Sequence, residues 1–227
     1  MGLTEFCDSS KGDFVSKCST TEGNIRQKNK AIILNAAKEE FVIYGFQGAS
    51  IKRIAERASI ARANIHYYFK DKTDLYQQLL TDIIEVWNSD YDTLNVENDP
   101  AQALKAYIRA KVIHSKEDPY SSRIFASELI HGAPVLDDYL NSVFKEWLQT
   151  KVEVIESWIE RGLMDKVNPH HLLFLIWSST QHYADFSVQV LAGLDKKALN
   201  DKDFEQVITS LTDIILKGCG IYELASA

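Results

Sequence analysis

Proline is rare in this chain, and long apolar runs are absent. The 227 residues include four prolines and ten glycines. A protein built from many short strands would need more of these residues in its turns. No apolar run approaches the ~18–20 residues that a membrane span needs. The start, MGLTEFCDSSKGDF, also lacks the basic-then-apolar pattern of a secretory signal. We therefore expect a cytoplasmic protein without a membrane segment.

Cysteine is equally scarce. The three cysteines are Cys7 and Cys18, in a polar leader, and Cys219 near the other end. An odd and scattered set is poor material for a disulfide framework and lacks metal-ligand spacing. A glycine-rich phosphate loop, a nucleophile elbow and a paired-carboxylate arrangement are missing as well. The sequence therefore predicts no cofactor, no metal site and no catalytic residues, so we do not expect an enzyme.

The net charge of -7 conceals an uneven distribution. Residues 25–72 carry ten Lys or Arg against four Asp or Glu, whereas residues 73–227 carry thirteen against twenty-four. The local charges are +6 and -11, which is typical of a small polyanion-binding module joined to a larger domain that does not bind the polyanion. We divide the chain accordingly into a leader (1–24), expected to be disordered, a basic domain (25–72) and an acidic domain (73–227).

Apolar residues recur at helical spacing beyond the leader, and the alternation typical of strands is absent. Gly45 is expected to end a first helix, Ser50 to cap a second helix, and the third to cover about 61–67. Further helices are expected at about 73–87, 100–116, 119–132, 135–161, 169–192 and 203–217, several of which open at a proline or close before a glycine. The sequence predicts an all-α fold with about nine helices.

The three short helices of the basic domain, with a tight turn between the second and the third, describe a helix-turn-helix. Such a unit lays its last helix in the major groove of DNA. Ile65 must face the small core, so the opposite side of that helix is available to DNA. Arg62 and Asn64 can hydrogen-bond base edges, and Tyr67 and Lys72 can reach phosphates. Function would then lie in sequence-specific binding of double-stranded DNA.

The segment SIKRIAERASIARANIHYYFKDKTDLY resembles the amino-terminal DNA-binding segment of the TetR family of bacterial repressors. The resemblance implies a homodimer whose two recognition helices read a palindromic operator. By position, Ser50, Tyr67 and Lys72 stand where the family contacts phosphates, and Arg62, Ala63, Asn64 and His66 stand where it reads bases.

Two residues depart from the family's turn, which usually reads Gly-Val-Ser. Ser59 must adopt a backbone conformation that glycine adopts freely, at a cost of roughly 1 kcal/mol. Ala61 lacks the hydroxyl that usually caps the recognition helix, a loss of about 1 kcal/mol. Neither change is expected to abolish the fold.

In the acidic domain, WSSTQHYADFSVQV is unusual for a helix interior. Gln181 falls beside Trp177, with Phe174 one turn before Trp177, and a buried carboxamide without partners costs a few kcal/mol. Another side chain, in the core or across a dimer interface, could satisfy this carboxamide. A small polar ligand could also satisfy it. Spacing alone favours the structural explanation.

SRIFASELIHGAPVL and LLFLIWSSTQHYADFSVQV are similar to stretches of the pyrimidine-utilisation regulators of the same family. This resemblance implies uracil or thymine as the effector, bound in the larger domain. By position, Trp87, Trp177 and Gln181 would form the nucleobase site, with Phe174 as a neighbouring wall, because a flat ring stacks on indole and its imide edge pairs with a carboxamide. We therefore expect a repressor controlled by a pyrimidine base, or alternatively by a different small molecule.

Two other functional classes can be compared with this prediction. A metal-dependent enzyme could use His182 and Asp185, three residues apart, but metal sites need three or four convergent ligands. A helical adaptor for another protein would leave the basic domain without a purpose. The predicted dimer seam comprises Leu172, Leu175, Ile176, Val190 and Ile214, although the core of a monomer would show the same pattern.

Overall fold

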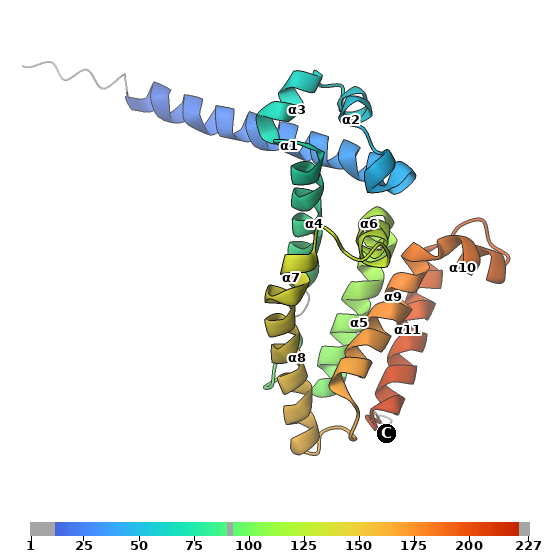
Figure 1. Cartoon of the computed structure of the whole chain (residues 1–227). Coiled ribbons are helices and arrows are strands. Elements are labelled where there is room, and N and C mark those ends of the chain that lie inside the picture. The colour runs from blue at the N-terminus through green and yellow to red at the C-terminus, as the bar shows by residue number, and fades with distance from the viewer. Residues whose placement is uncertain (1–11, 90–92, 223–227) are drawn as a thin grey trace, which may run out of the picture. The chain divides into compact units, whose positions relative to one another are not determined.

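The computed structural model describes residues 12–89 and 93–222, with side chains from residue 25 onward, and these residues form eleven α-helices and no strand (Figure 1). The predicted all-α fold is confirmed. The chain divides into two compact units, residues 1–75 and 76–227. None of the helices in the described ranges has both the length and the apolar character to span a bilayer.

The first unit is built from three helices and the beginning of a fourth. They are α1 (Gly12–Gly48), α2 (Ile51–Ala58), α3 (Arg62–Tyr68) and α4 (Lys72–Ser89), of which α4 continues into the second unit. Both α1 and α3 pack against α2. The small core contains the buried side chains Ile33, Phe41, Ile54, Ile65 and Phe69, which are spaced as helical faces require.

The long first helix differs from the prediction at its start. Residues 12–24, expected to belong to a disordered leader, are helical, while residues 1–11 lie outside the described part. Gly45 interrupts the regular helix, as expected: its φ of 65° and ψ of 175° are not helical, and a separate short turn follows to Gly48. A glycine allows this conformation because it has no Cβ to oppose a positive φ.

The turn between α2 and α3 carries the two departures noted in the sequence. Ser59 has φ 54° and ψ 39°, a left-handed conformation, and its backbone N–H donates to carbonyl oxygens at the end of α2. Ala61 occupies the N-cap position of α3 and forms no side-chain cap. Glycine at position 59 and a capping side chain at position 61 would therefore stabilise this turn more than Ser59 and Ala61 do.

Substitution of Ser59 by glycine is expected to raise the free energy of unfolding of the first unit by about 0.5–1 kcal/mol, because it relieves the left-handed strain. Hydrogen exchange of the α2 and α3 amides measures this local stability. Ser59→Ala is the control, since it removes the hydroxyl and keeps the strain. Equal stabilisation by both substitutions would contradict the explanation.

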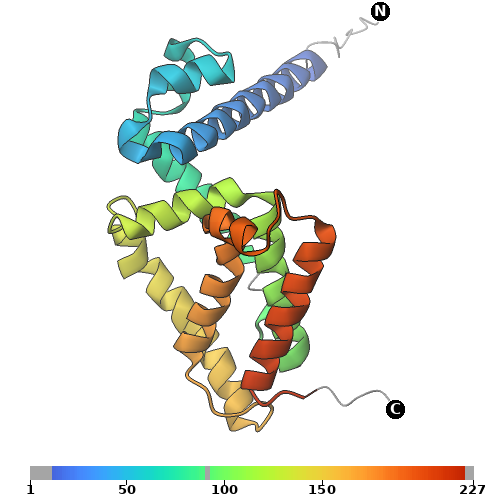
Figure 2. The ribbon, with the colours of Figure 1, turned by 90° about the vertical axis from the view of Figure 1, so that its right-hand side faces the viewer.

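The second unit is a helical bundle. After α4 it contains α5 (Pro100–Glu117), α6 (Pro119–Ile130), α7 (Asp137–Asn141), α8 (Val143–Glu160), α9 (Pro169–Asp185), α10 (Ser187–Gly193) and α11 (Asp201–Gly218). The middle helix α5 packs against both α9 and α11, and α6 and α8 also contact α9 (Figure 2). The core includes the fully buried residues Leu104, Ile108, Ile155, Trp158 and Leu173.

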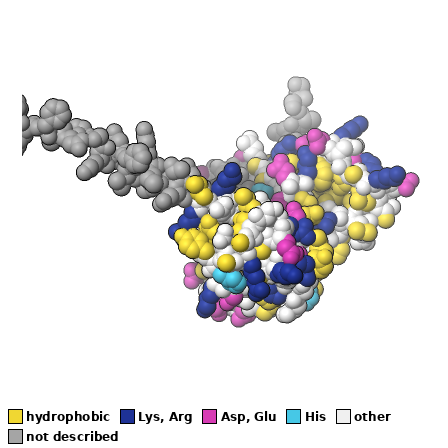
Figure 3. Space-filling model, turned by 90° about the horizontal axis from the view of Figure 1, so that it is seen from above, with side chains coloured by type: hydrophobic (Ala, Val, Ile, Leu, Met, Phe, Trp, Pro, Cys, Tyr) yellow, Lys and Arg dark blue, Asp and Glu magenta, His cyan; other side chains and the backbone are white. Residues whose placement is uncertain are grey.

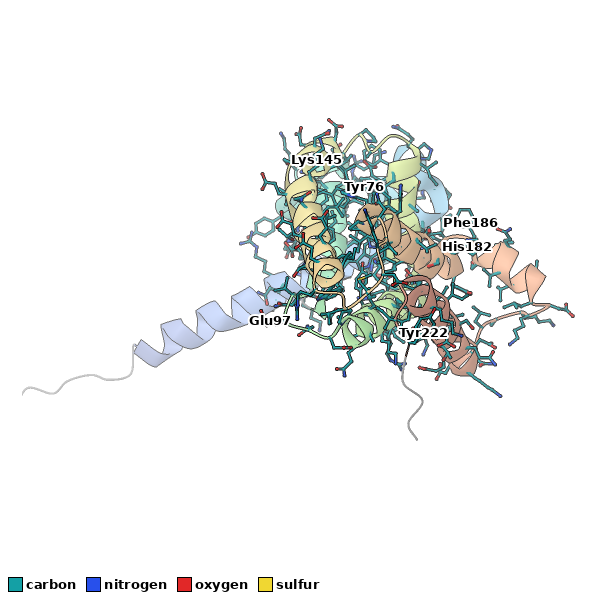
Figure 4. All side chains as sticks on the ribbon, turned by 90° about the horizontal axis from the view of Figure 1, so that it is seen from below. Tyr76, Glu97, Lys145, His182, Phe186 and Tyr222 are labelled. Atoms are coloured by element: carbon teal, nitrogen blue, oxygen red, sulfur yellow. The ribbon has the colours of Figure 1, made fainter. Side chains whose placement is uncertain are left out.

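Two helices expected to be continuous are each broken, which accounts for the higher helix number. The expected helix 135–161 is split at Ser142, whose hydroxyl donates to the Asp138 carbonyl at 2.6 Å and whose backbone has φ -124° and ψ -92°. Such a local bond lets the side chain compete with the helical backbone. The expected helix 169–192 is split at Phe186, whose ring stacks on His182 at 5.1 Å (Figure 4).

Candidate functional site

The recognition helix α3 presents one side to solvent. It buries Ile65 against the small core, while its exposed residues are Arg62, Ala63, Asn64, His66 and Tyr67. Tyr67 is 69% exposed although it is aromatic. In the view from above, Lys and Arg side chains lie among uncharged side chains and beside some Asp and Glu side chains (Figure 3). All five predicted α3 contacts are therefore accessible to a partner.

A buried carboxylate fixes α2 onto α1. Glu40 is completely buried, and its Oε1 accepts from Arg53 Nε at 2.6 Å and from the Ser50 backbone N–H at 3.2 Å. The Ser50 hydroxyl in turn accepts from the Arg53 backbone N–H at 3.4 Å, as an N-cap. Ser50 thus stands at the start of α2, where the family resemblance puts a phosphate contact, and Glu40 holds it there.

Lys72 has an internal role that the sequence did not predict. Its Nζ donates to the carbonyl oxygens of Phe46, Gln47 and Ala49 at 2.7, 3.3 and 3.2 Å, and lies 4.7 Å from the centre of the Phe46 ring. A cation here satisfies carbonyl groups that the end of α1 leaves without helical partners. A phosphate contact by Lys72, as predicted, would compete with these three bonds.

The second unit contains a partly open cavity of about 130 Å³. A cavity of ~150 Å³ is known to hold a benzene ring, so the size suits one six-membered ring. Its walls are mainly aromatic and aliphatic: Ile84, Trp87, Phe125, Leu129, Leu140, Phe144, Trp147 and Trp177. Around the cavity, Trp147 stacks on Trp177 with ring centres 6.3 Å apart, and Trp87 meets Phe125 edge to face with ring centres 5.0 Å apart. These flat surfaces favour a planar ligand.

Four polar residues line the same cavity: Asn88, Lys111, Tyr139 and Gln181. Burial raises the pKa of Tyr139, and a hydrogen bond to Asn88 opposes this rise, so these two side chains satisfy each other. Gln181 differs, because its carboxamide makes no hydrogen bond with any residue in the described part of the chain. It is a paired donor and acceptor suited to a ligand.

The lysine of the cavity is held against an aromatic wall. Lys111 is only 3% exposed, and its Nζ lies 4.1 Å from the centre of the Trp87 ring. Its charge is near Asp185. Burial raises the pKa of Asp185, and the Ser122 hydrogen bond and the charges of Arg123, His182 and Lys111 reduce this rise. The cavity therefore has a positive group at its edge whose charge is partly balanced inside the protein.

A hydrogen bond to a buried core residue fixes the orientation of the Trp177 ring. Its indole N–H donates to the hydroxyl of Tyr107 at 2.7 Å, and Tyr107 is completely buried in the core between α5 and α9. The bond orients the indole face that lines the cavity. Tyr107 thus positions a ring that could stack on a ligand.

The structure brings together three of the four predicted ligand-binding residues. Trp87, Trp177 and Gln181 line one cavity, whereas Phe174 does not line it and packs on Trp177 with ring centres 5.4 Å apart. Sequence reasoning missed the remaining walls and both Lys111 and Asn88. A signal for Lys111 was present, because it lies four residues after the apolar Tyr107 on the buried side of α5.

His182 and Asp185, the candidates for a metal site, are engaged elsewhere. Asp185 Oδ1 accepts from the Ser122 hydroxyl at 2.6 Å, and the His182 ring stacks on Phe186. Among the described residues, no group of three or more His, Cys, Asp or Glu side chains could hold a metal ion. This pair lacks the convergent ligands that a metal-dependent reaction requires.

Two family models match the chain. "Bacterial regulatory proteins, tetR family" covers residues 33–79, and "YcdC-like protein, C-terminal region" covers residues 80–222. The HTH-type transcriptional regulator RutR of Escherichia coli (strain K12) is 37% identical over 194 residues, which are 86% of this chain and 91% of the relative.

Solved structures share the same fold at low sequence identity. The ketosteroid transcriptional regulator KstR2 of Mycobacterium tuberculosis has a TM-score of 0.67 and 18% identity, with 83% of this chain and 93% of that chain covered. The fatty acid degradation regulator FadR from Bacillus halodurans has a TM-score of 0.64 and 19% identity, with 84% and 95% covered. At these identities the likeness concerns the fold alone.

Proposed function

Because the chain belongs to the TetR family of bacterial transcriptional regulators, we propose that it is an operator-binding repressor released from DNA by a single-ring pyrimidine, uracil or thymine. Family membership makes it a DNA-binding regulator with a helix-turn-helix, and not an enzyme. Regulators of this family bind DNA as dimers, bind small-molecule effectors and typically need no cofactor. Its operator would be palindromic and its location cytoplasmic, where bacterial DNA lies.

The observation that carries the effector proposal is Gln181 without a hydrogen-bond partner in the described part, on the wall of an aromatic cavity of about 130 Å³. Gln181 is half-buried, so its carboxamide is partly removed from water, and a ligand that pairs with it gains affinity. Uracil and thymine present an N–H beside a carbonyl, which matches the acceptor and the donor of glutamine. Stacking on Trp177 would add to this pairing.

DNA would be read by α3. In this proposal Arg62, Ala63, Asn64 and His66 meet base edges in the major groove, while the other predicted contacts, Ser50, Tyr67 and Lys72, meet phosphates. The support is the exposure of the whole α3 set and the fixed position of Ser50 beside buried Glu40. Lys72 would have to give up some of its carbonyl partners to reach a phosphate.

Effector and operator would compete through the dimer. Of the residues proposed for the dimer seam, Leu175 and Ile214 are exposed, whereas Leu172 and Ile176 are buried within the core of one chain and are assigned to that core. We assign the dimer face to the exposed pair on α9 and α11. If the effector favours one dimer state and operator the other, each must weaken the binding of the other by the same factor.

The test is the binding of the full-length protein to DNA upstream of its own gene, and to sites selected from random DNA, at one fixed salt concentration. We expect tight binding that uracil or thymine weakens and that adenine does not, since adenine lacks the N–H beside a carbonyl that would pair with the carboxamide of Gln181. Binding unaffected by both pyrimidines would keep the repressor and overturn the effector assignment. Failure to select any site would overturn the operator-binding proposal itself.

A further inference from the structure

Most basic side chains of the α2 region in the first unit are occupied by contacts within the protein. Arg53 pairs with Glu40, Arg57 Nη1 lies 2.7 Å from Glu39 Oε2, and Lys72 donates to backbone carbonyls. These groups stabilise the unit and contribute less to attraction of DNA, because their charges are balanced or hydrogen-bonded. The cations that remain for DNA must therefore lie elsewhere on this unit.

Such cations lie on α1, ahead of the segment 33–79 that matches the family. Arg26 is exposed and Lys30 is half-buried, and neither forms an ion pair with a described residue. They are four residues apart and so share one side of the helix, whereas exposed Lys28 points to nearly the opposite side. Only one side of this stretch of α1 can therefore face the same partner as α3.

Two contacts show that the side with Arg26 is the one beside the recognition helix. The Arg26 guanidinium lies 5.7 Å from the centre of the Tyr67 ring, and Asn29 Nδ2 donates to the Tyr68 hydroxyl at 3.3 Å. Tyr67 belongs to the exposed face of α3. A molecule that contacts the Tyr67 ring therefore also lies beside the Arg26 guanidinium.

We propose that Arg26 and Lys30 form a second phosphate-binding site on α1, which contacts the DNA backbone next to the groove that α3 enters. A guanidinium or an ammonium in this position binds phosphate oxygens and carries no base information. The site extends the footprint of each protomer beyond the helix-turn-helix. It adds affinity and salt dependence and leaves the preferred sequence unchanged.

The test measures the affinity of the full-length protein for its selected DNA site over a range of salt concentrations. Each phosphate contact contributes about 0.9 to the slope of log K against log salt concentration. Arg26→Ala with Lys30→Ala removes four contacts from a dimer, so we expect a slope shallower by about 3.6 and an unchanged consensus sequence. Hydroxyl-radical footprints should lose protection at the flank of each half-site.

Lys28→Ala is the matched control, because it removes one exposed charge from the opposite side of the same helix turn. The slope of this variant should equal that of the wild type. Arg26→Lys with Lys30→Arg keeps both charges and should keep the slope, which separates loss of charge from loss of the packing between Arg26 and Tyr67. Circular dichroism checks that each variant is folded.

Two results would overturn the proposal: a wild-type slope for the double alanine variant, or an equal loss in Lys28→Ala. Neither result depends on uracil as the effector. Absence of any selected site for the wild-type protein would instead count against the operator-binding function. The two failures are therefore distinguishable.

Discussion

Substitution of Gln181 by leucine is expected to weaken uracil binding by at least about 100-fold while leaving operator affinity unchanged. Leucine has nearly the same volume but neither a donor nor an acceptor, so a bound imide would leave two polar groups unpaired in an aromatic cavity. At about 1.5 kcal/mol for each group, the loss is about 3 kcal/mol, which exceeds a factor of 100. The variant should therefore repress and fail to respond.

Isothermal titration with uracil measures the uracil affinity, and DNA binding without and with uracil measures the operator affinity and the response. Gln149→Leu is the control, because Gln149 is exposed on α8 and bonds Glu153 at 3.3 Å outside the cavity. We expect wild-type behaviour from it. Uracil affinity that survives in Gln181→Leu would remove this residue from the effector site, and an equal loss in both variants would indicate a general defect.

The helices and part of the site could be predicted from the sequence because they depend on residues that are close together in the chain. Pro100, Pro119 and Pro169 each stand at the first helical turn after a capping Asp or Asn, and such start signals span only a few residues. Trp177 and Gln181 are four residues apart on one helix, so periodicity alone puts them on one side.

The remaining parts of the site depend on contacts between distant segments. Phe125 and Trp147 reach the cavity from α6 and α8, and their apolar spacing would suit any buried face. The break at Ser142 lies in non-helical backbone angles of one residue, which the helical pattern of the sequence around it conceals. Lys72 was assigned to phosphate because its neighbours at the end of α1 are more than twenty residues away in sequence.

Substitution of Glu40 by alanine is expected to destabilise the first unit by about 3 kcal/mol and to abolish operator binding, while uracil binding persists. Glu40 is completely buried, and its loss leaves the Ser50 N–H and Arg53 Nε without their acceptor. Breaking a buried ion pair costs ~3–5 kcal/mol. The low end applies here because the Arg53 side chain is 42% exposed and can regain water.

Hydrogen exchange resolved by residue distinguishes this local effect from global unfolding. Amides of residues 33–75 should lose protection in Glu40→Ala, and those of α5, α9 and α11 should keep it, because the two units have separate cores. Glu39→Ala is a matched control in the adjacent residue: Glu39 also pairs with Arg57, at 2.7 Å, but is half exposed. An exposed pair is worth less than about 1 kcal/mol.

The comparison of the two glutamates tests whether burial, and not the ion pair itself, gives Glu40 its importance. Both carboxylates face Arg57, so a role limited to charge would make their substitutions equivalent. If burial decides, only Glu40→Ala releases α2 from α1, and Ser50 loses the position from which it would meet a phosphate. Equal effects of the two substitutions would refute the proposed anchor, and lost protection in both units would refute their independence.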